Sequence, residues 1–230
     1  MKKTILFSTL TLLAGSLVAA DSTPKDDVTN AARKLGDQAN YSWKQTVVVP
    51  ESAQFKPGPT EGKTEKDGFT LLTWSFNDNT SQGVIKGDKG AATDPDGGWQ
   101  SLSEMENSEG FARFTARRLK NFKSPATQAA EIAASTTELK KEGDAYSGDL
   151  TEEGAKAQIR FGPNSNVSAA KASVKFWLKD GQLSKYEIKA SGKMDFNGNE
   201  QDVERTTTIE IKDVGTTKVT VPEGAQKKLS

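Results

Sequence analysis

The commonest pattern along the chain is an alternation of apolar and polar residues, which predicts antiparallel strands with one face buried and one face in water. It is strongest near the C-terminus, where Asp180-Gly181 and Asn197-Gly198 are typical hairpin turns. Residues 51–68 are polar and rich in glycine and proline, which predicts a loop or a long hairpin connection. The segments predicted to be strands are 41–49, 69–76, 83–86, a short piece near Ala91, 137–142, 145–150, 173–179, 185–193 and 204–212.

Helices are predicted at four places between the strands. Apolar residues at helical spacing indicate two of them, and typical helix starts at Ser124-Pro125 and Thr151 indicate the other two. In the middle of the chain, one side of a predicted helix is formed by Phe111, Phe114, Arg118, Leu119 and Phe122. The predicted helices cover residues 27–35, 111–122 and 126–134 and the segment that follows Thr151. Together the two patterns predict an α+β fold, in which helices cover the concave face of a twisted antiparallel sheet.

The N-terminus has the three parts of a secretory signal peptide. Two lysines precede an apolar run at residues 5–18, and small residues precede Asp21. The alternative is a membrane anchor, but polar residues interrupt the run, and a spanning helix needs about 20 mainly apolar residues. Residues 1–20 are therefore expected to be a cleaved signal, and the protein to be exported, either periplasmic or secreted. No other segment is apolar enough to be a transmembrane anchor in the mature chain.

Residues 21–230 are expected to form a single domain, because no repeat or linker divides them. Without Lys2 and Lys3, 29 of the 31 basic residues remain beside 31 acidic residues, so the net charge is near −2. That balance excludes the basic surface that nucleic acids require. The chain has no cysteine, so no disulfide contributes to its stability.

The chain has neither histidine nor cysteine, which excludes Ser-His-Asp and Cys-His catalysis, histidine-ligated zinc and thiol redox chemistry. A carboxylate pair or a serine–lysine pair stays possible, but no Gly-x-Ser-x-Gly motif is present. Glu152 and Glu153 are better explained as the first turn of a helix. The acidic turns at Asp94 and Asp195 lack the spacing of a calcium-binding loop. We therefore predict a protein that is not an enzyme and has no metal site and no cofactor.

Large apolar residues on the predicted strands, and on the helix above them, are the remaining functional signal. A packed core explains each residue alone, whereas the set could line a cavity that buries an acyl chain at about 0.8 kcal/mol per methylene. Arg113, Arg117 and Lys120 could meet a phosphate or carboxylate headgroup, or form a solvated helix face. The candidate cavity residues are Trp43, Leu72, Trp74, Phe76, Trp99, Phe111, Phe114, Phe176, Leu178, Tyr186 and Ile188.

The order of these elements resembles that of the LolA-like, LppX/LprG-like superfamily of bacterial periplasmic lipoprotein and lipid carriers. The matching features are the N-terminal helix, Gly98-Trp99, Glu142-Gly143-Asp144-Ala145-Tyr146-Ser147-Gly148, Lys175-Phe176-Trp177-Leu178-Lys179-Asp180-Gly181 and Val221-Pro222-Glu223-Gly224-Ala225. The resemblance implies an unclosed half-barrel, a curved antiparallel sheet whose concave side, under helices, holds acyl chains or a lipidated partner. Unlike the mycobacterial members, this chain has no lipobox cysteine, so the resemblance implies a soluble carrier, as LolA is.

We interpret the sequence as that of an exported, non-enzymatic protein that binds or carries a lipid, a lipoprotein or another apolar ligand. The alternative is a structural or protein-interaction module of the cell envelope, with a packed core and no ligand. The expected partner is an apolar small molecule or the acyl chain of a lipoprotein, and the sequence specifies no envelope protein as a partner.

Signal cleavage leads to a direct prediction for the exported protein. Its mature N-terminus should be Asp21, because the small residues Val18-Ala19-Ala20 form the cleavage site. N-terminal sequencing or mass spectrometry of protein recovered from outside the cytoplasm should find this end. Recovery of a membrane-extracted form that keeps Met1 would show that the segment is an anchor instead.

Overall fold

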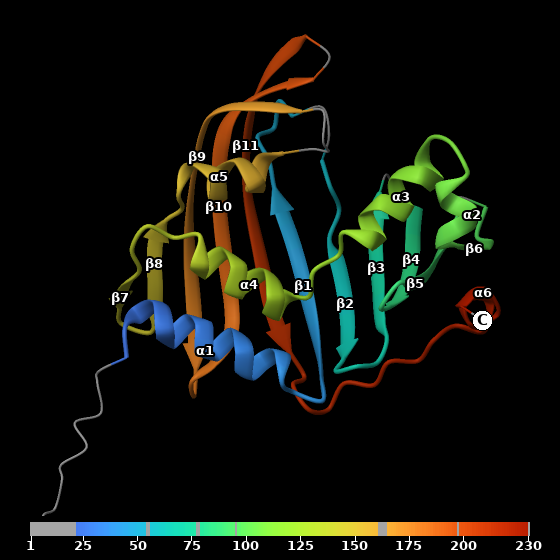
Figure 1. Ribbon diagram of the computed structural model, residues 1–230, viewed down its shortest axis with the longest axis horizontal. Coiled ribbons are helices and arrows are strands. Elements are labelled where there is room, and N and C mark those ends of the chain that lie inside the picture. Colours follow the sequence, from blue (N-terminus) through green and yellow to red (C-terminus); the bar gives the residue numbers. More distant parts are fainter. Residues whose placement is uncertain are drawn as a thin grey trace, which may run out of the picture.

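The computed structural model describes residues 22–53, 56–76, 79–94, 96–160, 165–196 and 198–229. Its strands form one antiparallel 11-stranded sheet in the order β6-β5-β4-β3-β2-β1-β11-β10-β9-β8-β7 (Figure 1). They are β1 (Asn40–Val48), β2 (Thr60–Glu65), β3 (Thr70–Phe76), β4 (Asn79–Lys86), β5 (Lys89–Thr93), β6 (Trp99–Ser101), β7 (Lys140–Glu142), β8 (Ala145–Asp149), β9 (Asn166–Lys179), β10 (Gln182–Phe196) and β11 (Asn199–Lys212). The edge strands β6 and β7 do not pair with each other, so the sheet is not closed into a barrel. The predicted α+β fold with an unclosed antiparallel sheet is confirmed.

Helices lie against this sheet in three groups. The helices that the structure describes are α1 (Pro24–Gly36), α2 (Leu102–Glu106), α3 (Phe111–Lys120), α4 (Pro125–Ala134), α5 (Glu152–Ile159) and α6 (Glu223–Leu229). Helices α1 and α5 contact β9 and β10, and α4 packs beside α1. Helices α2 and α3 contact each other and β5, and α6 contacts β5 and β6 (Figure 1).

The helix starts follow local sequence chemistry. Four helices begin after a residue whose hydroxyl accepts a hydrogen bond from a backbone N–H of the first turn, namely Thr23, Ser101, Ser124 and Thr151. At the other end of α4, Lys25 of α1 donates to the carbonyl oxygens of Ala134 and Thr136, at 3.0 and 3.2 Å. Helix α1 therefore satisfies carbonyl groups that the end of α4 leaves without helical partners.

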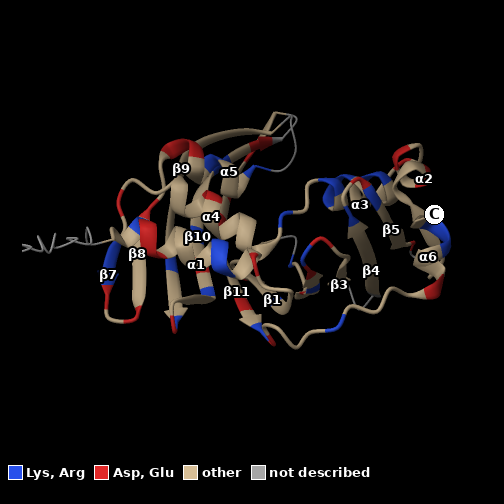
Figure 2. Cartoon of the chain, turned by 60° about the horizontal axis from the view of Figure 1, so that its bottom comes forward, with Lys and Arg blue, Asp and Glu red and all other residues tan. Residues whose placement is uncertain are grey.

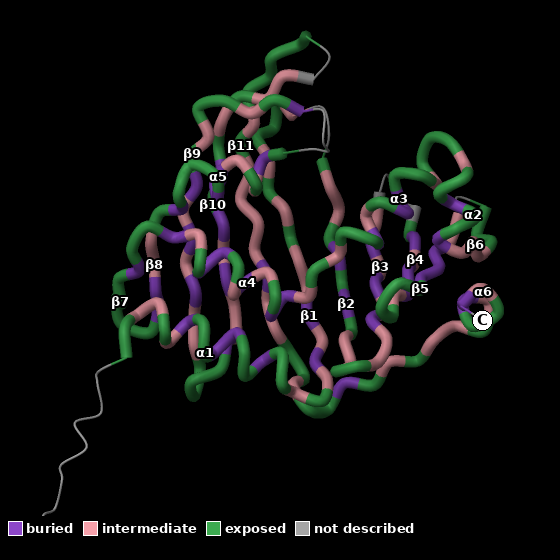
Figure 3. The backbone as a smooth tube through the Cα atoms, viewed as in Figure 1, coloured by how far each residue is buried: buried purple, intermediate pink, exposed green. Residues whose placement is uncertain are grey.

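Apolar side chains are buried on both faces of the sheet. Figure 3 shows how buried residues are distributed along the strands and helices. The larger core lies between the concave face and helices α1 to α5, and Phe176 and Tyr186 are among its largest members. The smaller core lies on the opposite face under α6, and its buried members are Val84, Ala91, Ala225 and Leu229. Ala92 belongs to the larger core, next to Ala91 in the smaller one, because successive strand residues point to opposite faces.

The structure corrects several expected boundaries. Residues 51–68, predicted as a loop or hairpin connection, contain β2, which pairs with β1 and β3 in the middle of the sheet. Strand β9 begins at Asn166, well before its predicted start at residue 173, and helices α2 and α6 are not predicted at all. In each case, pairing or packing with another segment supplies hydrogen bonds and burial that the local pattern does not reveal.

Residues 1–20, where the signal peptide is predicted, lie outside the described residues. Within the described residues, no helix is both long enough and apolar enough to cross a membrane. The single domain over residues 21–230 stays a prediction, although strands from both halves of the chain share one sheet.

Two tryptophan rings lie against glycines of neighbouring strands. A Cβ atom at Gly62 would overlap the ring of Trp43, and one at Gly83 would lie 3.0 Å from the ring of Trp74. Trp43 is 5% exposed, and its ring also stacks on Phe122 with the ring centroids 6.0 Å apart. The ring of Trp43 is therefore held from both sides, and Gly62 is required for the close approach.

Gly62→Ala should lower the free energy of unfolding by about 1–3 kcal/mol, the usual cost of adding a group to a filled space. Gly36→Ala is the control, because its Cβ would lie 3.5 Å from the Cβ of Ala126, an ordinary contact in a helix that favours alanine. Urea denaturation of both variants measures the difference. Equal stability of the two would show that Trp43 is not held against Gly62.

Candidate functional site

Four of the predicted cavity residues lie on β9 and β10 and form a packed centre. Phe176 and Tyr186 have no exposed surface, and their ring centroids are 6.0 Å apart. Ile188 is also buried, and Leu178 is half-buried. The hydroxyl of Tyr186 donates to Oε1 of Gln128 at 2.6 Å, which joins β10 to α4. Burial raises the pKa of this phenol well above its usual value, so the hydroxyl stays a hydrogen-bond donor.

Four further predicted residues lie on the central strands. Trp43 on β1 and Leu72 and Trp74 on β3 are all buried in the larger core. Trp43 is paired with Gly62 of β2, and Gly62 is paired with Leu72, so these side chains follow one another across the sheet. Phe76 ends β3, and its side chain lies outside the part of the molecule that the structure describes.

The remaining three predicted residues lie elsewhere. Trp99 on β6 packs with α6 in the smaller core, on the opposite face of the sheet. Phe111 and Phe114 lie on α3 and are 40% and 42% exposed. The structure therefore brings the residues of β1, β3, β9 and β10 to one face, and it separates Trp99 from them.

Arg118 on α3 lies against the concave face and is not among the predicted cavity residues. Its guanidinium carbon lies 4.8 Å from the centroid of the Trp74 ring, and Nη2 donates to Oγ1 of Thr60 at 3.0 Å. Burial lowers the pKa of this guanidinium from its usual value. One sequence feature could have identified Arg118 as an inward-facing residue, namely its helical spacing from Phe111 and Phe114. The basic residues considered for a headgroup are exposed on the same helix, and they are Arg113, Arg117 and Lys120. Figure 2 shows the basic residues of α3 in blue.

Arg205 on β11 is a second arginine of the concave face. It lies four residues before Ile209, which is buried in the larger core, so both side chains point to the same face. It is paired with Ala190 of β10, another member of that core. Arg205 is half-buried, and burial lowers the pKa of its guanidinium. Strand alternation places this residue inward, but nothing in the local sequence distinguishes it from the exposed charges beside it.

The middle of the concave face is less covered than the parts under the helices. The connection from α3 to α4 crosses β1, where Phe122 stacks on Trp43 (Figure 1). Beyond that stack, towards the end of β1, inward-facing residues are half-buried, so solvent reaches them. We call this region the central surface, and it comprises the half-buried Gln45, Val47, Arg118, Arg205 and Thr207, with the buried Thr60 at its edge.

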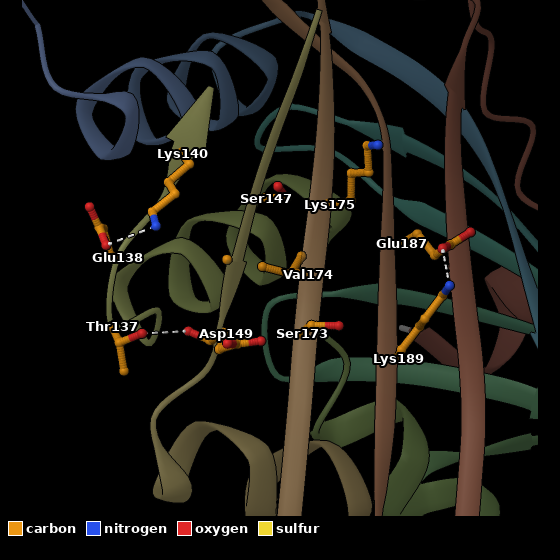
Figure 4. Close-up of a pocket in the computed structure, with 11 residues that line it drawn as sticks. Thr137, Glu138, Lys140, Ser147, Asp149, Ser173, Val174, Lys175, Glu187 and Lys189 are labelled. Atoms are coloured by element: carbon orange, nitrogen blue, oxygen red, sulfur yellow. Dashed lines mark hydrogen bonds and ion pairs between the residues drawn. The ribbon is translucent and has the colours of Figure 1, made fainter. Parts of the chain in front are cut away.

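Two pockets lie away from the central surface. The first has a volume of about 390 Å³ and lies on the outer face of β8, β9 and β10 (Figure 4). Its charges include two ion pairs, Glu138 with Lys140 and Glu187 with Lys189, each at 3.8 Å. The second, of about 800 Å³, lies beside α6. Neither pocket is lined by a predicted cavity residue.

The two acidic turns considered for calcium use their carboxylates to hold the turn itself. Oδ1 of Asp94 accepts a hydrogen bond from the backbone N–H of Gly98 at 2.7 Å, and Oδ1 of Asp195 accepts one from that of Gly198 at 2.8 Å. This is ordinary turn chemistry for aspartate. Within the described ranges, no cluster of three or more acidic residues is placed to hold a metal ion.

Comparison with solved structures identifies proteins of the same layout. The chain is similar to the lipoprotein LppX of Mycobacterium tuberculosis, with a TM-score of 0.51 and 10% identity over 86% of this chain and 98% of LppX. The fold is LppX-like. LprF of Mycobacterium bovis is similar with a TM-score of 0.46 and 9% identity, over 88% of this chain and 97% of LprF. The sequence matches no family model and no curated protein sequence. The predicted resemblance to LppX/LprG-like proteins is thus confirmed for the fold.

The hydrogen bond of Tyr186 provides a test of how the helices are held on the sheet. Tyr186→Phe should lower the free energy of unfolding by about 1–2 kcal/mol, because it leaves Oε1 of Gln128 without its partner. Tyr146→Phe should cost less, because Tyr146 keeps 5% of its surface exposed, whereas Tyr186 keeps none, so water can more readily replace the Tyr146 hydroxyl. Thermal or urea denaturation distinguishes the two variants. A larger loss for Tyr146→Phe would contradict a central role for the Tyr186 contact.

Proposed function

We propose that this chain is an exported, non-enzymatic carrier that binds a lipid or another apolar ligand on the concave face of its open sheet. The observation that carries the proposal is the central surface, where a face that is otherwise covered by helices is only half-buried. The fold shared with LppX supports the same kind of function.

The chemistry of the central surface suits binding without reaction. An alkyl chain placed there would contact Val47 and the half-buried ring of Phe122, whereas Trp43 is buried beneath that ring. Each methylene that leaves water contributes about 0.8 kcal/mol, from which the cost of ordering the ligand is subtracted. The polar groups of the surface are amide, hydroxyl and guanidinium groups, and none of these is an effective base at neutral pH.

A second function is favoured by the packing under the helices. Leu72 is 2% exposed, and Phe176 and Tyr186 are 0% exposed, so these residues face no water-sized space in the absence of a ligand. A filled core of this kind is what a structural or protein-interaction module of the envelope would have. The two functions differ in one measurable property, the uptake of an alkyl probe.

Adjacent valines on β1 allow a matched test of ligand uptake. Val47 is half-buried and faces inward, whereas Val48 is 61% exposed and points to the other face. Val47→Asp should weaken binding of a fluorescent long-chain fatty-acid probe by about tenfold or more, because a carboxylate replaces apolar contact with the chain. Val48→Asp should leave the affinity unchanged. Fluorescence titration of the mature protein and both variants measures these affinities.

Two results would contradict the carrier function. One is the absence of saturable probe binding by the unmodified protein, which would favour the structural module. The other is equal weakening by both aspartate substitutions, which would show that the probe binds outside the concave face. Native mass spectrometry of protein purified from its own cell envelope would identify the ligand by its mass.

A further inference from the structure

Two arginines on the concave face carry charge that their surroundings do not neutralise. A guanidinium is protonated at all physiological pH values. Arg118 donates one hydrogen bond to Thr60 and lies over Trp74, but neither contact supplies a negative charge. Within the described residues, no acidic side chain forms an ion pair with Arg118 or Arg205. Burial, which removes both guanidinium groups from water, lowers the pKa of each.

This arrangement has an energetic cost that a ligand can offset. A charge moved out of water is unfavourable unless an opposite charge or several hydrogen bonds compensate it. Arg118 has five N–H donors, and the structure pairs one of its terminal nitrogens with Thr60. Donors of both arginines therefore remain available to an acceptor that enters from the central surface.

The sheet register places the two arginines on either side of the apolar part of the central surface. Arg118 reaches the sheet at Thr60 of β2, and Arg205 belongs to β11. Strand β1 lies between β2 and β11, and its residue Val47 is paired with Thr207, two positions from Arg205. An alkyl chain that lies on Val47 would therefore have one guanidinium group on each side, that of Arg118 towards β2 and that of Arg205 on β11.

We propose that the ligand of the central surface carries an anionic headgroup, a carboxylate or a phosphate, which binds at one of the two guanidinium groups that flank Val47, that of Arg118 or that of Arg205. This inference rests on the proposed carrier function, because the alkyl part of the same molecule occupies the same surface. The planar guanidinium suits such headgroups, because its N–H groups match the spacing of two carboxylate or phosphate oxygens.

The test compares ligands that share one alkyl chain and differ in the headgroup. Dodecyl phosphate, dodecanoate and dodecanol are titrated against the mature protein, each displacing a neutral fluorescent alkyl probe, and inorganic phosphate is titrated alone. The two anions should bind about tenfold or more tightly than dodecanol, because they accept charge-assisted hydrogen bonds. At least one of Arg118→Gln and Arg205→Gln should reduce this preference, and both should leave the affinity for dodecanol unchanged. Arg113→Gln, which alters an exposed arginine of α3, should keep the full preference.

Each other outcome overturns a defined part of the inference. Equal affinity for all three alkyl compounds would overturn anion recognition and leave the carrier function intact. Binding of none of them would overturn the carrier function as well. Inorganic phosphate that binds as tightly as dodecyl phosphate would show that the site takes a free anion and not a lipid headgroup. If circular dichroism shows that Arg118→Gln does not fold, Arg205→Gln and the headgroup preference of the unmodified protein decide the question.

Discussion

The stack of Phe122 on Trp43, over the bare backbone of Gly62, is the contact on which the arrangement of the helices depends. Residues 121–124 are the whole connection between α3 and α4. With Phe122 held over β1, α3 must lie on one side of the central strands and α4 on the other. The position of α3 brings Arg118 to Trp74, and the position of α4 brings Gln128 to Tyr186. The half-buried central surface is what these two helix groups leave between them.

Charged residues are arranged differently on the two faces of the sheet. On the outer face, charges of opposite sign lie beside each other on neighbouring strands, as Lys44 and Glu61 do at 3.4 Å. Such exposed pairs contribute little to stability, because water and salt screen them. On the concave face, Arg118 and Arg205 are partly removed from water without an acidic partner among the described residues. A charge in that environment is costly for folding and useful for recognition.

Much of the fold could be predicted because the sheet buries one face along most of its strands. Alternation predicted β3 and the core parts of β9, β10 and β11, and Ser124 and Thr151 marked the starts of α4 and α5. Strand β2 was missed because its inward residues are small or polar, as at Thr60 and Gly62. Helix α6 was missed because only Ala225 and Leu229 of its residues are buried. Short elements of this kind depend on their partners and carry a weak pattern of their own.

The order of residues was enough to predict which side chains of a strand share a face, because strand geometry imposes a period of two. The sequence also excluded catalysis by histidine or cysteine, since neither residue occurs in the chain. Which faces meet, and what covers them, depended on the tertiary structure. It placed Trp99 under α6, Arg118 against Trp74, and Arg205 on a face shared with Val47. These neighbours come from the pairing of segments far apart in the chain, as β1 pairs with β11, and local periodicity contains no information about such pairing.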